Sequence, residues 1–236
     1  MAYIYRLLVL LVAVAFLGFG QELTGASNPE YSIINTPHIA STSLLGVFIV
    51  NGVTGEKQSF GSGTYIRSGN TYYILTAAHV LAPLMLTNLY ACYNEAQGAG
   101  ICTTIVRNLD DLLIDPERDI AIAPLEGPVP ARTALGIEPD YNWSIGETVW
   151  VSGYPNGTRS INRGNISGTL GTGRIFIDAD VWWGSSGGGV WNDRGELIGV
   201  VSALQLVPMS CQNCPLGVVE GNKIIALIPR HLLDQL

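Results

Sequence analysis

Short apolar segments separated by turn residues recur along most of this chain, and this pattern limits the folds open to it. With 28 Gly and 12 Pro among 236 residues, turns are frequent and long stretches of helical periodicity are nearly absent. The exception follows Pro229, where Leu232, Leu233 and Leu236 fall on one face of a short helix. Most of the apolar segments are rich in residues that favour strands: Leu44–Val50, Tyr72–Thr76, Asp119–Ala123, Thr148–Gly153, Arg174–Asp178 and Leu197–Ser202. The sequence therefore predicts an all-β fold, either a sandwich or a pair of barrels.

Turn and proline signals divide the chain into two halves. Asn51-Gly52 and Asn156-Gly157 are strong turn dipeptides, because both residue types tolerate a positive φ. Residues 126–140 contain several prolines and little periodicity, which is typical of a connector. We therefore expect one β-barrel over residues 41–125 and a second over residues 141–236, the second ending in the terminal helix.

The first 26 residues have the character of an export signal. An unbroken apolar run of 13 residues, Leu7–Phe19, follows Arg6. A membrane-spanning helix needs about 20 apolar residues, so the run has the length of a signal-peptide core. An uncleaved membrane anchor is the alternative. Either interpretation predicts that the remainder is exported, as a secreted or periplasmic protein, with membrane contact only if the segment is retained.

The net charge and the cysteines narrow the partners and the compartment. A formal net charge of −7 argues against a nucleic-acid-binding surface, which needs clustered Lys and Arg. Four cysteines in an exported chain predict two disulfides, Cys92–Cys102 and Cys211–Cys214. A redox-active Cys-x-x-Cys unit at Cys211 and Cys214 and a four-thiolate zinc site are the alternatives.

Three short motifs carry the residues of nucleophilic catalysis. Ser186 stands among glycines in Gly184–Gly188, His79 follows the strand that ends at Thr76, and Asp119 opens an apolar strand. Each motif alone is weak, but together they give the order His, Asp, Ser, with separations of 40 and 67 residues. In such a set the serine attacks, the histidine takes its proton, and the carboxylate fixes the histidine tautomer.

Other interpretations of these motifs remain open from the residues alone. Competing carboxylates for the acidic role lie nearby, at Asp110, Asp111 and Asp115, although no strand follows them in the same way. The stretch around Ser186 also satisfies the Gly-x-Ser-x-Gly elbow of α/β-hydrolases, a fold that needs strands alternating with helices. A third alternative is a catalytically silent binding module on the same fold.

Together with these motifs, residues 44–233 resemble the chymotrypsin-like serine peptidases, and most of all the HtrA/Deg-type branch without a PDZ domain. The resemblance is carried by these segments: Phe60–Ile66, Val151–Gly157, Ile177–Val181, Gly195–Val200 and Ile225–Pro229. It implies two six-stranded antiparallel β-barrels with the catalytic groups between them. It also implies a serine endopeptidase that acts on proteins or peptides and needs no cofactor or metal.

The resemblance further implies roles for residues around Ser186. The backbone amides of Gly184 and Ser186 would form the oxyanion hole. Asp180 would lie at the base of the primary specificity pocket and favour Arg or Lys, with small apolar residues as the competing preference. One wall of this pocket would be formed by Val201, Ser202 and Ala203. Ser185 replaces the aspartate with which digestive proteases accept a new N-terminus. Trp182 and Trp183 would either wall the groove or pack in the core.

Overall fold

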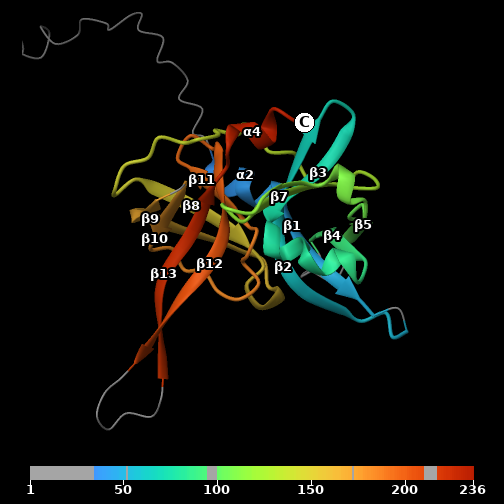
Figure 1. The fold of residues 1–236 in the computed structure, drawn as a ribbon, viewed down its shortest axis with the longest axis horizontal. Helices are drawn as coiled ribbons and strands as arrows, with labels where there is room; N and C mark the ends of the chain where they lie inside the picture. The colour runs from blue at the N-terminus through green and yellow to red at the C-terminus, as the bar shows by residue number, and fades with distance from the viewer. Residues whose placement is uncertain (1–34, 52, 95–99, 172, 210–216) are drawn as a thin grey trace, which may run out of the picture. The chain divides into compact units, whose positions relative to one another are not determined.

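The first half of the chain forms a curled antiparallel sheet (Figure 1). The computed structural model describes residues 35–51, 53–94, 100–171, 173–209 and 217–236. The sheet order is β5-β4-β1-β2-β3-β7-β6. An isolated bridge joins Ile105 to Leu125, so that the ends of β5 and β7 meet and β6 is an additional strand beside β7. Six strands thus surround the first core. The strands are β1 (Leu44–Val50), β2 (Lys57–Ser68), β3 (Thr71–Ala77), β4 (Leu89–Tyr93), β5 (Ile101–Thr104), β6 (Leu113–Asp115) and β7 (Ile120–Pro124).

The second half closes into a six-stranded barrel with the order β10-β13-β12-β11-β8-β9. Every ladder between the named strands of both halves is antiparallel. The predicted all-β fold of two antiparallel barrels is therefore confirmed, and the α/β-hydrolase alternative is wrong because that fold is built on alternating strands and helices. The strands are β8 (Thr148–Gly153), β9 (Ser160–Gly171), β10 (Arg174–Ile177), β11 (Gly189–Asn192), β12 (Leu197–Met209) and β13 (Gly217–Leu227).

Short helices lie at the ends and between strands. The sequence predicts the last of them, α4, which begins directly after Pro229 and buries Leu232. It does not predict α2, in which Asn35 caps the first turn by accepting a hydrogen bond from the His38 amide at 3.1 Å. Only Thr36, Ala40 and Ser43 of α2 are buried, too weak a pattern to signal a helix. The helices are α2 (Thr36–Ser43), α3 (Ala78–Leu81), η1 (Ala82–Met85), η3 (Leu109–Asp111), η4 (Pro155–Gly157) and α4 (Arg230–Leu233).

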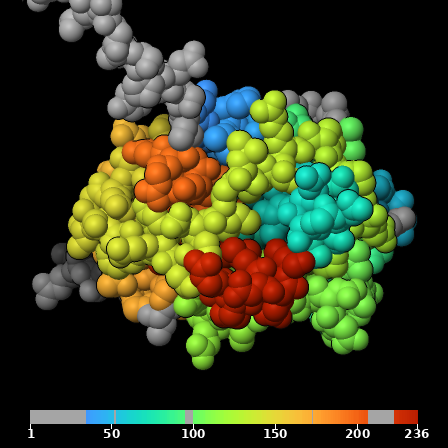
Figure 2. All heavy atoms as spheres, turned by 90° about the horizontal axis from the view of Figure 1, so that it is seen from above, coloured from blue at the N-terminus to red at the C-terminus, as the bar shows by residue number. Residues whose placement is uncertain are grey.

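A shared apolar cluster joins the two halves. Each half has its own core, but a third cluster combines Leu75 and Ile122 of the first half with Trp191, Ala226 and Leu232 of the second. Figure 2 shows the C-terminal segment (red) on the surface between residues of both halves. Its last carbonyl accepts a hydrogen bond from the Ser68 hydroxyl at 2.9 Å. These contacts hold the ends of β3, β7 and β11 close together.

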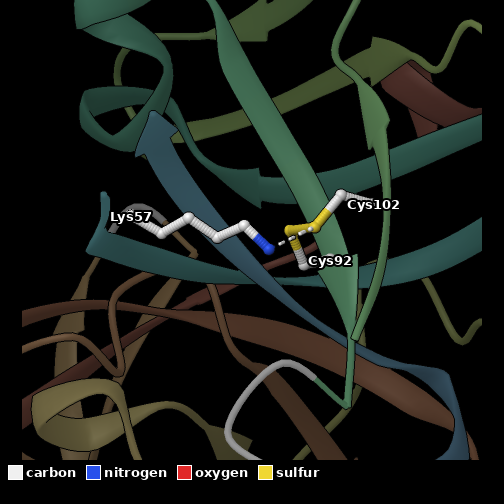
Figure 3. The surroundings of a disulfide bond; sticks show 3 residues. All are labelled: Lys57, Cys92 and Cys102. Atoms are coloured by element: carbon white, nitrogen blue, oxygen red, sulfur yellow. Dashed lines mark hydrogen bonds between the residues drawn. A yellow bond between two sulfur atoms is a disulfide. The ribbon is translucent and has the colours of Figure 1, made fainter. Parts of the chain in front are cut away.

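A disulfide ties together two neighbouring strands of the first sheet. Cys92 of β4 and Cys102 of β5 are directly paired in register and joined by an S–S bond of 2.03 Å (Figure 3). The Lys57 ammonium lies 3.8 Å from Cys102 Sγ. The predicted Cys92–Cys102 pairing is therefore confirmed. It rules out a four-thiolate zinc site, because these two sulfurs are not thiolates. Cys211 and Cys214 lie outside the described residues.

The predicted signal peptide or anchor, residues 1–26, also lies outside the described residues. Among the helices that the structure describes, none is long and apolar enough to cross a membrane. Between β7 and β8, the chain forms no named strand or helix. The boundaries of the connector predicted at residues 126–140 stay a prediction.

Candidate active site

His79 and Asp119 meet where β3 and β7 lie side by side. Ala77 of β3 pairs with Ile120 of β7 in this ladder. His79 comes two positions after Ala77 and Asp119 comes directly before Ile120, so the two residues are neighbours. His79 Nδ1 lies 2.8 Å from Asp119 Oδ2, and the His79 backbone amide donates to Oδ1 at 3.0 Å. Asp119 has a φ of 60°, which aspartate tolerates better than most residues. Both carboxylate oxygens are thus directed at one histidine, and Nε2 is left on the opposite side of the ring.

Ser202 completes the surroundings of the Asp119 carboxylate. Its hydroxyl donates to Oδ2 at 2.7 Å, the same oxygen that faces His79 Nδ1. Burial opposes ionisation of this carboxyl, but the hydrogen bonds from His79 and Ser202 outweigh it, so the pKa of Asp119 is lowered. The sequence predicts Ser202 only as a pocket wall. Its bond to Asp119 could not be read from residues 83 positions apart.

Two of the three competing carboxylates have other partners. Asp111 accepts a hydrogen bond from the Asn108 side chain at 2.7 Å, and Asp115 lies 3.8 Å from Arg118 and 3.6 Å from His231. Asp110 belongs to the same 3-10 helix, η3, as Asp111. Within the described ranges, no three His, Cys, Asp or Glu side chains are grouped so that they could hold a metal ion.

The loop that carries Ser186 is anchored by its own backbone. The Ser186 carbonyl accepts a hydrogen bond from the Ser62 amide at 2.7 Å, and the Gly187 amide donates to the Val201 carbonyl at 2.7 Å. Gly187 has a φ of 82°, and a Cβ there would lie 2.0 Å from Thr76 Oγ1. A side chain at this position would therefore push the loop away from β3, the strand that leads to His79.

Two amides of this loop are left without an acceptor. The amides of Ser185, Gly187 and Gly188 donate to backbone carbonyls at 2.7–2.9 Å. Those of Gly184 and Ser186 have no acceptor among the residues that the structure describes. Gly184 has a φ of 95°. Such a pair of unsatisfied donors is what an oxyanion hole requires.

The two adjacent serines differ in exposure. The Ser185 side chain is buried, and its hydroxyl accepts a hydrogen bond from the Trp182 amide at 3.3 Å. Ser186 is only half-buried and lines a cavity that it shares with His79 and Asp119. Of the two, Ser186 is the one whose hydroxyl a substrate in this cavity can reach.

The cavity beside Ser186 has a volume of 300 Å³ and a mostly apolar lining. The predicted wall residues all line it: Val201, Ser202 and Ala203. Trp182 and Trp183 also line it and are 42% and 63% exposed, so they wall the groove rather than pack in the core. The remaining lining residues are His79, Asp119, Val181, Ser186 and Leu204.

Asp180 does not line this cavity, in contrast to the expectation from the resemblance. From Ile177 to Val181 the side chains alternate between buried and exposed, as in extended backbone, and Asp180 is on the exposed side. Its neighbour Val181 is buried and lines the cavity instead. Counting six residues back from Ser186 therefore reaches a side chain that faces away from the cavity, and the prediction of a basic specificity has no support from this geometry.

Comparisons with known proteins agree with this fold. Residues 61–200 match a family model described as a trypsin-like peptidase domain. No curated protein matches the sequence. The fold is similar to the crystal structure of the serine endoprotease from Yersinia pestis, with a TM-score of 0.57, 23% identity and coverage of 85% of this chain and 63% of that one. It is also similar to the HtrA-type protease AlgW with decapeptide, with a TM-score of 0.61, 20% identity and coverage of 86% and 66%. This chain thus spans less than two thirds of either structure.

Proposed function

Because this chain belongs to the trypsin-like peptidase family, we propose that it is a serine endopeptidase with Ser186 as nucleophile, His79 as general base and Asp119 as the group that orients it. One observation carries the proposal. Ser186 lines the same cavity as His79, whose Nδ1 is held 2.8 Å from a carboxylate with a lowered pKa. This arrangement leaves Nε2 as the nitrogen that can take the serine proton.

The reaction would proceed in two steps through an acyl-enzyme. Ser186 Oγ attacks the carbonyl carbon of the scissile bond while His79 takes the hydroxyl proton. The C–N bond then breaks, and His79 gives the proton to the leaving amine. Water repeats the sequence on the ester and releases the new carboxyl end. The negative oxygen formed in each step would be bound by the amides of Gly184 and Ser186, and one such donor is commonly worth about 3 kcal/mol.

The cavity lining supports a preference for an uncharged, apolar side chain at the acyl side of the scissile bond. Its walls include Val181, Val201 and Ala203. Among the described residues that line it, the one carboxylate is that of Asp119, which already accepts hydrogen bonds from His79 and Ser202. A buried Arg or Lys would find no free partner there, which costs several kcal/mol. We therefore expect cleavage after aliphatic residues of modest size.

The adjacent serines supply a matched test. A fluorophosphonate probe should label the native protein and the Ser185→Ala variant but not Ser186→Ala. Peptidase turnover should fall by on the order of 10⁴-fold in Ser186→Ala. A folded native protein that neither reacts with the probe nor cleaves any peptide would contradict the proposal and favour the silent binding module.

We also propose that the protein acts after export. The Cys92–Cys102 disulfide supports this, since such bonds persist in oxidising compartments. Cell fractionation together with N-terminal sequencing of the mature protein would test it and would distinguish a cleaved signal peptide from a retained anchor. Recovery of the protein only in the cytoplasm would refute export.

A further inference from the structure

A buried hydroxyl of the first half contacts the loop that carries the two unsatisfied amides. Ser62 lies in β2, and its side chain is fully buried. Its hydroxyl donates to the Gly184 carbonyl at 2.7 Å and accepts a hydrogen bond from the Tyr154 amide at 2.8 Å. Both partners belong to the second half, 122 and 92 positions away along the chain. One hydroxyl of the first half thus bonds to two backbone segments of the second.

Every carbonyl of this loop is held by a hydrogen bond. We call residues 182–186 the oxyanion loop, and each of its carbonyls accepts a hydrogen bond at 2.7–2.9 Å. The donors, in the order of the carbonyls, are the amides of Ser185 and Asn156, the Ser62 hydroxyl, and the amides of Gly188 and Ser62. In a planar trans peptide unit the oxygen and the N–H point in opposite directions. Fixing a carbonyl therefore fixes the direction of the amide in the same unit.

The Ser62 hydroxyl holds the peptide unit that links the two unsatisfied donors. The Gly184 amide shares its unit with the Trp183 carbonyl. The Ser186 amide shares its unit with the Ser185 carbonyl. A single unit stands between them, formed by the Gly184 carbonyl and the Ser185 amide. Its amide bonds back within the loop at 2.9 Å, and Gly184, with a φ of 95° and no side chain, restrains it little. The bond from Ser62 ties this unit to the rest of the molecule.

We propose that Ser62 is a positioning residue, whose hydroxyl keeps the amides of Gly184 and Ser186 directed at one point before substrate binds. Without it, the Gly184 carbonyl and the Tyr154 amide lose their partner, and a buried polar group without a partner is costly. Gly184 is only half-buried, so its carbonyl can turn towards water and regain a partner. That turn rotates the linking unit and separates the two donors. The inference rests on the proposed peptidase function, because the hole acts only on the negative oxygen of that reaction.

A matched pair of buried serines tests the proposal. Ser152→Ala is the control for Ser62→Ala, because the Ser152 hydroxyl is also buried, donates to a glycine carbonyl and accepts one N–H. Its partners, Gly189 and Trp191, lie outside the oxyanion loop. In Ser62→Ala we expect kcat and kcat/KM to fall equally, by on the order of 10-fold to 100-fold, since loss of a whole donor costs on the order of 10²-fold to 10³-fold. The control should keep the native kcat. A kcat that falls equally in both variants, or in neither, would overturn the proposal.

An inhibitor that mimics the tetrahedral intermediate separates the hole from the triad. A peptide boronate bonded to Ser186 places a negative oxygen where the two amides converge. Its dissociation constant should rise in Ser62→Ala by the same factor by which kcat/KM falls. The pH dependence of kcat/KM, which His79 governs, should keep its native shape. A changed pH dependence together with native boronate affinity would place the effect on the triad and contradict the positioning role.

The native protein supplies a test that needs no variant. In crystal structures of the free protein and of its boronate complex, the Gly184 carbonyl should accept the Ser62 hydroxyl in both, and in the complex both amides should bind the boronate oxygen. If both amides bind that oxygen while the carbonyl has turned away from Ser62, the proposal is wrong, even where Ser62→Ala does not fold. A native protein that neither reacts with a fluorophosphonate nor cleaves peptides would refute the peptidase function, and this inference with it. An active native protein and an equally active Ser62→Ala variant would refute the positioning role alone.

Discussion

Replacing Ser202 by alanine should weaken the positioning of His79 without removing an atom that reacts. The Ser202 hydroxyl donates to Asp119 Oδ2 at 2.7 Å, and the same oxygen lies 2.8 Å from His79 Nδ1. Hydrogen bonds to charged groups contribute about 1.5–3 kcal/mol. The Asp119 side chain is 20% exposed, so water can replace part of the lost bond. We expect a net loss of about 1 kcal/mol, which lowers kcat about fivefold.

The variant also has an effect on acid stability whose sign is fixed by the structure. The pKa of Asp119 is lowered from its ordinary value of 3.8, with the Ser202 bond as one of the causes. The stability that the ionised carboxylate contributes is present above that ordinary value and is lost as the pH falls through the folded pKa. Removing the bond raises the folded pKa of Asp119 towards its ordinary value, so in Ser202→Ala the carboxylate contributes less stability, and this smaller contribution is fully lost at a higher pH.

The assay combines steady-state kinetics with acid unfolding. Because Ser202 also lines the cavity, kcat and KM are measured separately, and the positioning role predicts the change in kcat. Ser152→Ala is the matched control: its hydroxyl is buried and donates to the Gly189 carbonyl at 3.2 Å, away from Asp119. The control should lose the same amount of stability at neutral and at acid pH, because the hydrogen bonds to Asp119 are kept. A Ser202→Ala variant with native kcat, and with a loss of stability that is equal at neutral and at acid pH, would refute the reasoning.

Three further predictions follow from single positions. Gly188→Ala should lower the free energy of unfolding by about 2–4 kcal/mol, because its Cβ would lie 1.9 Å from a backbone carbonyl oxygen. In the control Gly127→Ala, the atom nearest to the new Cβ is 3.9 Å away. Denaturant unfolding compares the two variants, and equal losses of stability would contradict the packing argument. Asp119→Asn should flatten the pH dependence of stability below about pH 4, which acid titration followed by circular dichroism measures. If stability falls with pH as steeply as in the native protein, the ionised carboxylate is not stabilised in the fold. Asp180→Ser should leave the ratio of cleavage after Val to cleavage after Arg unchanged in matched peptides, since its side chain faces away from the cavity; a shift towards Val would restore Asp180 as a specificity residue.

The sequence by itself determined the fold class and the identity of the residues that meet at the site. Alternating apolar segments predict strands because side chains on a strand point to opposite faces in turn. The segments Leu44–Val50 and Thr148–Gly153 coincide with β1 and β8. His79, Asp119 and Ser186 could be selected because their three motifs, each weak alone, occur together in the order of a known catalytic set, which can be read without any knowledge of distance.

Tertiary structure alone decided the contacts between distant segments. The bond from Ser202 to Asp119 spans 83 positions and depends on how the two halves pack, which no local pattern encodes. The exposure of Asp180 depends on the alternation of side chains along an extended segment, so a count of residues back from Ser186 reaches a side chain that does not line the cavity. The length of β12 was also hidden, because beyond Val200 the strand that pairs with it among the described residues is β13, and strand pairing joins residues far apart in the chain. Short motifs indicate which residues can react, whereas strand register, packing and the exposure of strand edges depend on residues far apart in the chain.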